Sequence, residues 1–418
     1  MAVGRRFNNW RALTREPVAR AADSPEVRLK FVQSRILVSA GEASGDHYAA
    51  GVVTHLRRLL PGVEFFGCTG VEMRAAGVRT VVDSASLSVV GLVEVLQHIP
   101  RIYGEFRKLV GAARRERPVA AILTDSPDFH LRLAVKLRRM GVPVFYLVAP
   151  QAWAWREGRA GVLRRNVREL HCIFPFEEEF FRARGVNAHY IGHPLAGTVR
   201  PALTREEFLA KHRIPTGRPL VTLCPGSREG ESARHLGPLR EAVERIGAQR
   251  EATFLLAVPE GSRARFGDDF YAPLTGGGQV QIVEGETRDA MAYADVTLAA
   301  SGTVVMEAAL LGAPVVAFYR VSALSWRIGR PFVKVPYYTM VNLVAGRRVV
   351  PELIQHEMTG ERLAAEALAL LESEAARAEM RAGLAEVARR LASHGDPLEE
   401  SAQRVAASLL VDGLVEGR

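Results

Sequence analysis

The sequence predicts an α/β protein that contains two doubly wound domains, each built on a parallel sheet. Three observations support this prediction. Short apolar runs rich in β-branched residues alternate with longer helical patterns, and each run ends in Gly, Ser, Pro or Asp. The alternation stops in a looser stretch near residues 193–217 and then begins again. The chain has 418 residues, which is enough for two domains of ordinary size.

The first domain follows from the apolar runs after residue 34. We expect its strands at residues 36–38, 63–66, 119–123 and 144–148. Helical patterns that continue to Leu60 and over Leu131–Met140 separate these runs. Runs that are apolar at every position are typical of parallel strands covered by helices on both faces. We therefore expect a Rossmann-like domain over residues 35–200.

The second domain repeats this pattern. We expect its strands at residues 220–223, 253–258, 280–283, 296–298 and 315–318. After Pro351 the chain is almost wholly helical and rich in Ala, Leu, Glu and Arg. We therefore expect a second Rossmann-like domain over residues 201–418, with a helical C-terminal region included in it.

Composition limits the environment of the chain. Lys and Arg (55) exceed Asp and Glu (46), so the formal net charge is +9. We expect residues 1–34, which are strongly basic and lack the apolar core of a secretory signal, to form a flexible extension. No stretch reaches the ~18 consecutive apolar residues of a membrane-spanning helix. The three cysteines lie far apart and the histidines do not cluster, so we expect a reducing cytoplasm, no metal and no cofactor.

Polar residues follow the first strand, at the edge of the sheet where parallel sheets bind ligands. Glu42, Ser44 and Asp46 stand here among glycines that allow tight backbone geometry. These side chains could face a ligand. Alternatively, Ser44 or Asp46 could simply cap the helix that follows.

A second polar group, Asp125-Ser126-Pro127-Asp128, follows the strand at residues 119–123. Pro127 ends the strand, and Asp128 could cap the next helix. Asp125 then has no structural task, and it stands where a general base would be placed. We therefore predict that Asp125 is catalytic.

The second domain contains a predicted anion site. Ser301, Gly302 and Thr303 lead from a strand into a helix, so backbone N–H groups and the helix dipole can face a phosphate. Glu307 lies one helical turn after Thr303, where its carboxylate could accept hydrogen bonds from ribose hydroxyls. Arg228 follows another strand and could bind phosphate oxygens. A capped helix and a plain turn with an exposed Arg are the alternatives.

Two further stretches have an unusual composition. Trp153 and Trp155 stand in a strand-end loop, where they either pack in the core or line a substrate cleft. Residues 319–350 contain no acid, and they mix bulky aromatic residues with bases, which favours a membrane interface or an anionic ligand. The bases are Arg320, Arg327, Arg330, Lys334, Arg347 and Arg348.

In their order along the chain, these motifs resemble the lipid-A-disaccharide synthase family. The segments that carry the resemblance are Ser39–Asp46, Val90–Leu96, Asp125–Phe129, Trp153–Arg156, Gly192–Pro194, Pro225–Arg228, Ser301–Glu307 and Asn342–Arg347. Each is weak alone, but eight in family order over about residues 36–360 make the match specific.

The resemblance implies a GT-B fold, with two Rossmann-like domains facing across a cleft and the nucleotide held mainly by the second. It implies an inverting transfer from UDP-2,3-diacylglucosamine to 2,3-diacylglucosamine 1-phosphate (lipid X), with Asp125 as the base. Arg228, Glu307 and Asn342 match family positions tied to UDP. Contacts with the acceptor or the cleft are expected less directly from Glu42, Ser44, Asp46, Asp128, Trp153, Arg156 and Arg347.

The chain departs from the family pattern at two positions. His130 stands where the family usually has Asn, and Val341 stands where it usually has Pro. Neither change removes a reactive group, but both affect the loops that carry predicted site residues.

Two other interpretations fit parts of the sequence. Another GT-B enzyme, such as a UDP-N-acetylglucosamine 2-epimerase, would share the strand-end anion sites. A nucleic-acid-binding protein would fit the positive charge, but the chain has no nucleic-acid motif, so we expect no nucleic acid. As partners we expect the two acylated substrates and an anionic membrane surface. This places the chain in the cytoplasm, peripherally associated with the inner membrane, and an oligomer is possible.

Overall fold

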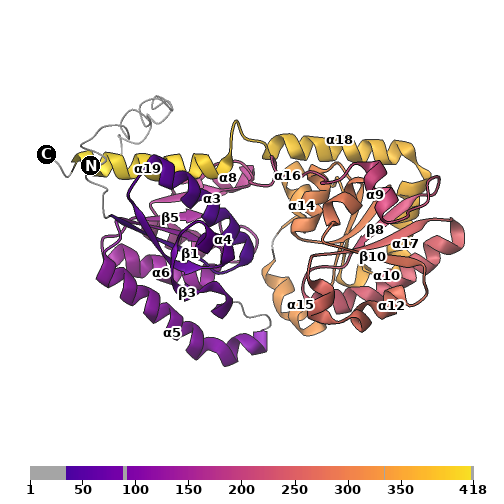
Figure 1. Ribbon diagram of the computed structural model, residues 1–418, viewed down its shortest axis with the longest axis horizontal. Helices are drawn as coiled ribbons and strands as arrows, with labels where there is room; N and C mark the ends of the chain where they lie inside the picture. Colours follow the sequence, from indigo (N-terminus) through magenta and orange to yellow (C-terminus); the bar gives the residue numbers. More distant parts are fainter. Residues whose placement is uncertain (1–33, 88–91, 334, 416–418) are drawn as a thin grey trace. The chain divides into compact units, whose positions relative to one another are not determined.

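The computed structural model describes residues 34–87, 92–333 and 335–415 (Figure 1). The chain forms two compact units, one from residues 1–194 and 393–418 and the other from Leu195–Ala392. The predicted basic extension lies outside the described residues, apart from its last position. So do Lys334 and the first two residues of the Val90–Leu96 segment.

The first unit contains a seven-stranded parallel sheet. Its strands are β1 (Arg35–Ala40), β2 (Glu64–Thr69), β3 (Arg79–Asp83), β4 (Ala120–Thr124), β5 (Val144–Leu147), β6 (Glu169–Cys172) and β7 (Ala188–Tyr190). Their order is β3-β2-β1-β4-β5-β6-β7, so the winding reverses between β1 and β4. In this register Ala40 lies opposite Thr124. The residues that follow these two strands therefore meet at the switch point, where doubly wound sheets bind ligands.

Helices cover both faces of this sheet, as the continuous apolar strands predict. They are α3 (Ala43–Leu59), α4 (Val71–Ala75), α5 (Leu92–Glu116), α6 (Pro127–Arg139), α7 (Arg159–Asn166), α8 (Pro175–Arg182) and α19 (Pro397–Val415), with a short 3-10 helix η2 at Ser84–Ser86. All five β4 residues are buried. The predicted strands at 36–38, 63–66, 119–123 and 144–148 are present, whereas β3, β6 and β7 were not predicted.

The C-terminal helix belongs to the first unit, although the sequence analysis placed residues 201–418 together. The yellow α19 lies along α3 in Figure 1. Its Ser401 hydroxyl is 2.7 Å from Nδ1 of His171 in β6, and its Arg404 pairs with Glu169 in the same strand. The apolar pattern of a helix shows that one of its faces is buried, but it does not show against which sheet the helix packs.

The second unit contains a six-stranded parallel sheet. Its strands are β8 (Leu220–Cys224), β9 (Thr253–Val258), β10 (Val280–Glu284), β11 (Val296–Ala300), β12 (Val315–Tyr319) and β13 (Glu352–Ile354). Their order is β10-β9-β8-β11-β12-β13, so the switch point lies between β8 and β11. The first five strands match the predicted runs. The edge strand β13 was missed, because its three residues stand in a region whose composition is helical.

The helices of the second unit surround this sheet. They are α9 (Arg205–Lys211), α10 (Glu229–Gln249), α11 (Ser262–Phe266), α12 (Ala272–Thr275), α13 (Thr287–Ala292), α14 (Thr303–Leu310), α15 (Ala323–Gly329), α16 (Met340–Ala345), α17 (Gly360–Glu372) and α18 (Glu374–Leu391). The 3-10 helices are η3 (Asp268–Tyr271), η4 (Arg330–Phe332) and η5 (Gln355–Glu357). Within the described residues, no helix is both long enough and apolar enough to cross a membrane.

Candidate active site

Asp125 lies directly after β4, at the switch point of the first sheet. Its backbone has a φ of 52°, in the left-handed region that few non-glycine residues adopt. The backbone N–H of Gly41 donates to Oδ1 at 2.8 Å, and that of Glu42 donates to Oδ2 at 3.1 Å. Both donors come from the loop after β1. The two polar groups predicted separately from the sequence therefore form one site.

Two glycines leave the space that this carboxylate occupies. A Cβ on Gly45 would lie 1.7 Å from Oδ2 of Asp125, and a Cβ on Gly41 would lie 2.1 Å from Oγ of Ser126. Each distance is far below van der Waals contact, so any larger residue would displace Asp125 or its neighbour. These glycines of the Gly41–Asp46 segment are thus required by packing against Asp125.

The main chain of Asp125 is held as firmly as its side chain. Its carbonyl oxygen accepts hydrogen bonds from the Tyr146 hydroxyl at 2.7 Å and from Nδ1 of His130 at 3.0 Å. Because a carbonyl can only accept, Nδ1 carries the proton, and Nε2 therefore accepts from the Ser39 hydroxyl at 2.7 Å. Burial lowers the pKa of His130 to about 4, so this imidazole is neutral and does not form an ion pair with Asp125.

The environment of Asp125 brings its titration near neutral pH. Its side chain is 12% exposed. Burial raises the pKa of Asp125 to about 7, although hydrogen bonds from Gly41, Ser126 and Glu42 act in the opposite direction. A carboxylate with this pKa can take a proton from a hydroxyl and return it to solvent at physiological pH. The structure thus gives Asp125 the properties expected of a general base.

The other polar residues of the first loop have different surroundings. Asp46 is buried and accepts hydrogen bonds from the backbone N–H groups of Gly70 at 2.7 Å and Glu72 at 2.8 Å, so it holds the start of α4. This is a structural role, and it corrects the expectation that Asp46 faces a ligand. Glu42 and Ser44 are exposed, and they stand in the loop whose backbone donates to Asp125.

Asp128 is not the N-cap residue of α6, because Ser126 holds that position and forms no side-chain cap. Instead its carboxylate binds Arg156 at 2.8 Å and Arg159 at 2.9 Å. The guanidinium of Arg156 also lies 4.2 Å from the ring centre of Trp155, which is 43% exposed. Asp128, Trp155 and Arg156 are exposed, whereas Arg159 is buried beneath them.

Trp153 has a separate environment. It packs against the hydrophobic core and meets Phe176 edge to face. Its indole N–H donates to Oε1 of Glu177 at 3.1 Å. Burial raises the pKa of Glu177 to about 8. Core packing describes Trp153, whereas Trp155 is exposed, and whether it lines a substrate cleft stays a prediction.

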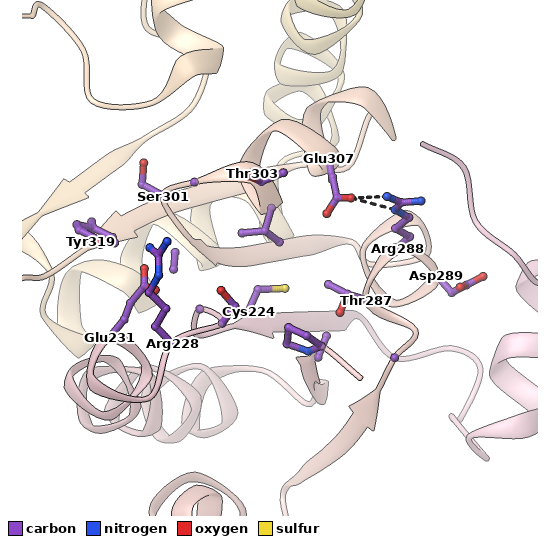
Figure 2. Close-up of a pocket in the computed structure, with 18 of the residues that line it drawn as sticks. Cys224, Arg228, Glu231, Thr287, Arg288, Asp289, Ser301, Thr303, Glu307 and Tyr319 are labelled. Carbon is purple, nitrogen blue, oxygen red and sulfur yellow. Dashed lines mark hydrogen bonds and ion pairs between the residues drawn. The ribbon is translucent and has the colours of Figure 1, made fainter. Parts of the chain in front are cut away.

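The second unit has a cavity of about 610 Å³ at the carboxyl ends of its central strands. Five predicted residues line it: Arg228, Ser301, Gly302, Thr303 and Glu307. Thr303 is the first residue of α14, so the helix N-terminus faces this space. In Figure 2, Arg228 lies at one end of the cavity with Glu231 and Tyr319, and Glu307 lies at the other.

Glu307 is held by a residue that the sequence analysis missed. Arg288, in the first turn of α13, donates to Oε1 of Glu307 from Nε at 3.0 Å and from a terminal nitrogen at 2.7 Å (Figure 2). The Glu307 side chain is 17% exposed and that of Arg288 is 42% exposed. No motif signals this pair, because it joins two helices that are separated in the sequence by strand β11.

The comparisons with known proteins agree on one family. Residues 36–404 match the family model described as lipid-A-disaccharide synthetase. A curated relative from Solibacter usitatus, named lipid-A-disaccharide synthase, is 59% identical over 385 residues, which covers 92% of this chain and 98% of the relative. The chain belongs to the lipid-A-disaccharide synthetase family. Its members are glycosyltransferases, and the resemblance noted in the sequence is confirmed.

Solved structures show the fold of this lipid-A-disaccharide synthetase family member. A calicheamicin glycosyltransferase aligns with a TM-score of 0.56 at 15% identity and covers 91% of this chain and 98% of its own. The UDP-GlcNAc 2-epimerase of Neisseria meningitidis aligns with a TM-score of 0.57 at 12% identity and covers 90% and 100%. The predicted GT-B fold is confirmed. At these identities the likeness to an epimerase is one of fold alone, so it does not favour the epimerase interpretation.

The position of Asn342 differs from the expectation carried over from the lipid-A-disaccharide synthase family. Its side chain is fully buried and does not line the cavity. Its oxygen accepts from the backbone of Val349 at 2.7 Å and Val350 at 3.0 Å, and its nitrogen donates to Val350 and Glu352. Asn342 therefore fixes the turn between α16 and β13, and its contact with UDP stays a prediction.

Arg347 also lies outside the cavity. Its guanidinium donates to Glu386 of α18 at 3.0 Å, and its predicted contact with the acceptor or the cleft stays a prediction.

Both departures from the family pattern are accommodated locally. His130 replaces the usual Asn and forms the bridge between Ser39 and the Asp125 carbonyl. Val341 replaces the usual Pro in the first turn of α16, where Pro is tolerated but not required. Thr339 caps this helix by accepting from the N–H of Asn342 at 3.2 Å, so the helix begins normally.

Proposed function

We propose that Asp125 is the general base of the glycosyl transfer. UDP-2,3-diacylglucosamine is the donor, and the 6-hydroxyl of 2,3-diacylglucosamine 1-phosphate is the acceptor. The observation that carries this proposal is the carboxylate of Asp125, which is held by two backbone N–H groups and has a pKa of about 7. An α-linked donor that gives a β-1,6 product reacts with inversion, so one displacement is enough.

In this step the acceptor hydroxyl loses its proton to a carboxylate oxygen of Asp125. The hydroxyl oxygen forms a bond to the anomeric carbon of the donor, while the bond from that carbon to the UDP oxygen breaks. UDP leaves with the electron pair, and the proton on Asp125 passes to solvent. Gly41 and Glu42 keep the carboxylate oriented throughout, so no reorganisation is needed as its charge is neutralised.

The second unit is suited to bind the UDP part of the donor. The N-terminus of α14, at Thr303, and the exposed Arg228 can stabilise the diphosphate as negative charge develops on it. Arg288 engages only Oε1 of Glu307, so Oε2 is the oxygen that we assign to the ribose hydroxyls. We assign Arg288 the task of orienting Glu307.

An exposed surface in the second unit suits the acylated substrates. Leu324, Ile328 and Phe332 are 69%, 51% and 60% exposed, and they follow one another at intervals of four residues along α15 and η4. Arg327 and Arg330 stand between them. Apolar side chains flanked by bases are typical of surfaces that lie on anionic membranes. We propose that this surface, the α15 face, attaches the chain peripherally to the inner membrane from the cytoplasm.

The decisive experiment for the activity is chromatographic detection of the disaccharide 1-phosphate and UDP from the two acylated substrates. Product from the unsubstituted chain, together with its near absence in Asp125→Asn, is the expected result. Turnover of the donor without an acceptor would instead favour an epimerase-like or hydrolytic reaction.

Attachment to the membrane has its own test. Sedimentation with anionic vesicles should fall as salt rises, and it should fall further when Arg327 and Arg330 are both changed to Gln. If neither salt nor the two substitutions changes the fraction of protein that sediments with the vesicles, the α15 face is not the membrane-binding surface.

A further inference from the structure

A second cavity of about 350 Å³ lies in the same unit, between the end of β12 and helix α15. Its apolar wall includes Val321, Trp326, Val333 and Ile354. Trp326 is partly buried, and its ring lies 6.3 Å from that of Tyr338, which lines the same space.

This cavity adjoins the one assigned to UDP. Ser301 and Tyr319 line both spaces, so a molecule that occupies the first cavity can extend into the second past these two side chains. The two cavities differ in chemistry. The first contains Arg228, Glu307 and Arg288, whereas the lining of the second is mainly apolar.

Two polar side chains in the wall of the second cavity are engaged by neighbouring residues. The side chain of Gln355 accepts from the N–H of Val321 at 3.1 Å and donates to its carbonyl at 3.0 Å. The Ser325 hydroxyl accepts from Ser322 at 2.8 Å. Arg330 is exposed and lines the cavity where it can reach solvent. The inner wall therefore offers apolar surface and few groups that could recognise a polar ligand.

We propose that this second cavity binds one acyl chain of the diacylated sugar nucleotide. The inference rests on the proposed function, because the occupant is a part of the donor. A methylene group takes up about as much space as a water molecule, ~30 Å³, so the cavity accommodates roughly ten carbons. Each methylene moved from water into an apolar site raises affinity about fourfold, up to the length that the cavity accommodates.

Gly329 allows the cavity to be filled without a clash in the fold. It lines the cavity, it has a helical φ of −82°, and a Cβ on it would meet no atom within 4 Å. Gly329→Leu therefore places a side chain in or beside the space proposed for the acyl chain. Gly247→Leu is the matched control, because Gly247 is an exposed position of α10 where a Cβ also meets nothing within 4 Å.

The experiment measures affinity for UDP and for UDP-glucosamine donors that carry acyl chains of increasing length. In the unsubstituted chain and in Gly247→Leu, affinity should rise severalfold per methylene and then level off. In Gly329→Leu, affinity for UDP should be unchanged. The total increase in donor affinity from the shortest to the longest acyl chain should be smaller than in the control by about tenfold or more. Trp326→Ala should have the opposite effect and move the plateau to longer chains.

Two failures are distinguishable. If UDP binds but the dependence on chain length is absent, or is the same in Gly329→Leu as in the control, the acyl site is overturned and the nucleotide site stands. If UDP itself does not bind, the proposed nucleotide site fails, and the acyl site fails with it.

Discussion

In the first unit, Asp125 is almost buried. Its carboxylate accepts from the backbone N–H groups of Gly41 and Glu42, and its carbonyl accepts from Tyr146 and His130. In the second unit, Arg228 is exposed at the side of an open cavity. Both residues lie at the switch points of sheets with the same type of winding. The fold therefore decides where polar groups gather, and the local packing decides how rigidly they are held.

This difference matches the two tasks that we propose for these residues. Proton transfer requires a base within a few tenths of an ångström of its place, and it gains from a raised pKa, so a buried and rigid carboxylate is suitable. A charged nucleotide must enter and leave, so an open site with exposed cations is suitable. Changes at the first site should therefore affect turnover, and changes at the second should affect nucleotide affinity.

The largest expected effect is that of Asp125→Asn. Loss of the base should lower turnover by roughly 10²–10⁴-fold, whereas the affinity for UDP, measured by calorimetry, should remain nearly the same. The amide keeps the size of the carboxylate, so circular dichroism should report a folded chain. Turnover near that of the unsubstituted chain would remove Asp125 from the mechanism.

Gly45→Ala tests whether rigid placement matters by itself. The added Cβ would lie 1.7 Å from Oδ2 of Asp125, so the carboxylate must move. A misplacement of about 1 Å can cost on the order of 10²-fold in rate, and we expect a loss of about that size in kcat with UDP affinity unchanged. Gly104→Ala in α5, where a Cβ meets nothing within 4 Å, is the control. Equal activity in both variants would show that Asp125 is not held as described.

Arg228→Ala tests the open site. A hydrogen bond to a charged group contributes about 1.5–3 kcal/mol, and exposure reduces this, so the affinity for UDP should fall about tenfold. Because Arg228 is exposed, added salt should weaken UDP binding in the unsubstituted chain more than in the variant. Calorimetry at two salt concentrations measures both effects, and unchanged titrations would reject the phosphate role of Arg228.

The smallest expected effect is that of pH within one unit of neutrality. Burial raises the pKa of Asp125 to about 7, and only the deprotonated form can accept a proton. The value of kcat/KM should therefore be half-maximal near pH 7 and fall about tenfold for each unit below it. UDP affinity should show no matching step at this pH. A flat rate profile between pH 5.5 and 7 would contradict the raised pKa.

The sequence located the ends of the central strands, and with them Asp125, Arg228 and the residues of the α14 N-terminus. These positions could be predicted because strand, turn and helix signals are local. The hydrogen bonds that His130 and Tyr146 donate to the Asp125 carbonyl were not predicted. Tyr146 reaches this carbonyl from the neighbouring strand β5, and His130 reaches it from the first turns of α6.

The differences between the predicted and the observed surroundings of other residues have the same physical origin. Asp46 and Asn342 were placed in the site because of their polarity and motif, but tertiary packing buries both and satisfies them with backbone partners. Arg288 was missed because its partner Glu307 is brought near only by the fold. Burial and long-range pairing are not properties of a local pattern, so such assignments need the structure.

The position of α19 has a consequence for synthesis of the chain. Most of the first unit leaves the ribosome first. Its contacts between α3 and α19, and the contacts of His171 and Glu169 with Ser401 and Arg404, can form only after the C-terminal region is synthesised. The second unit is complete at Ala392. The unit that begins first is therefore finished last, and a chain released before α19 is translated would expose part of its first core to chaperones and proteases.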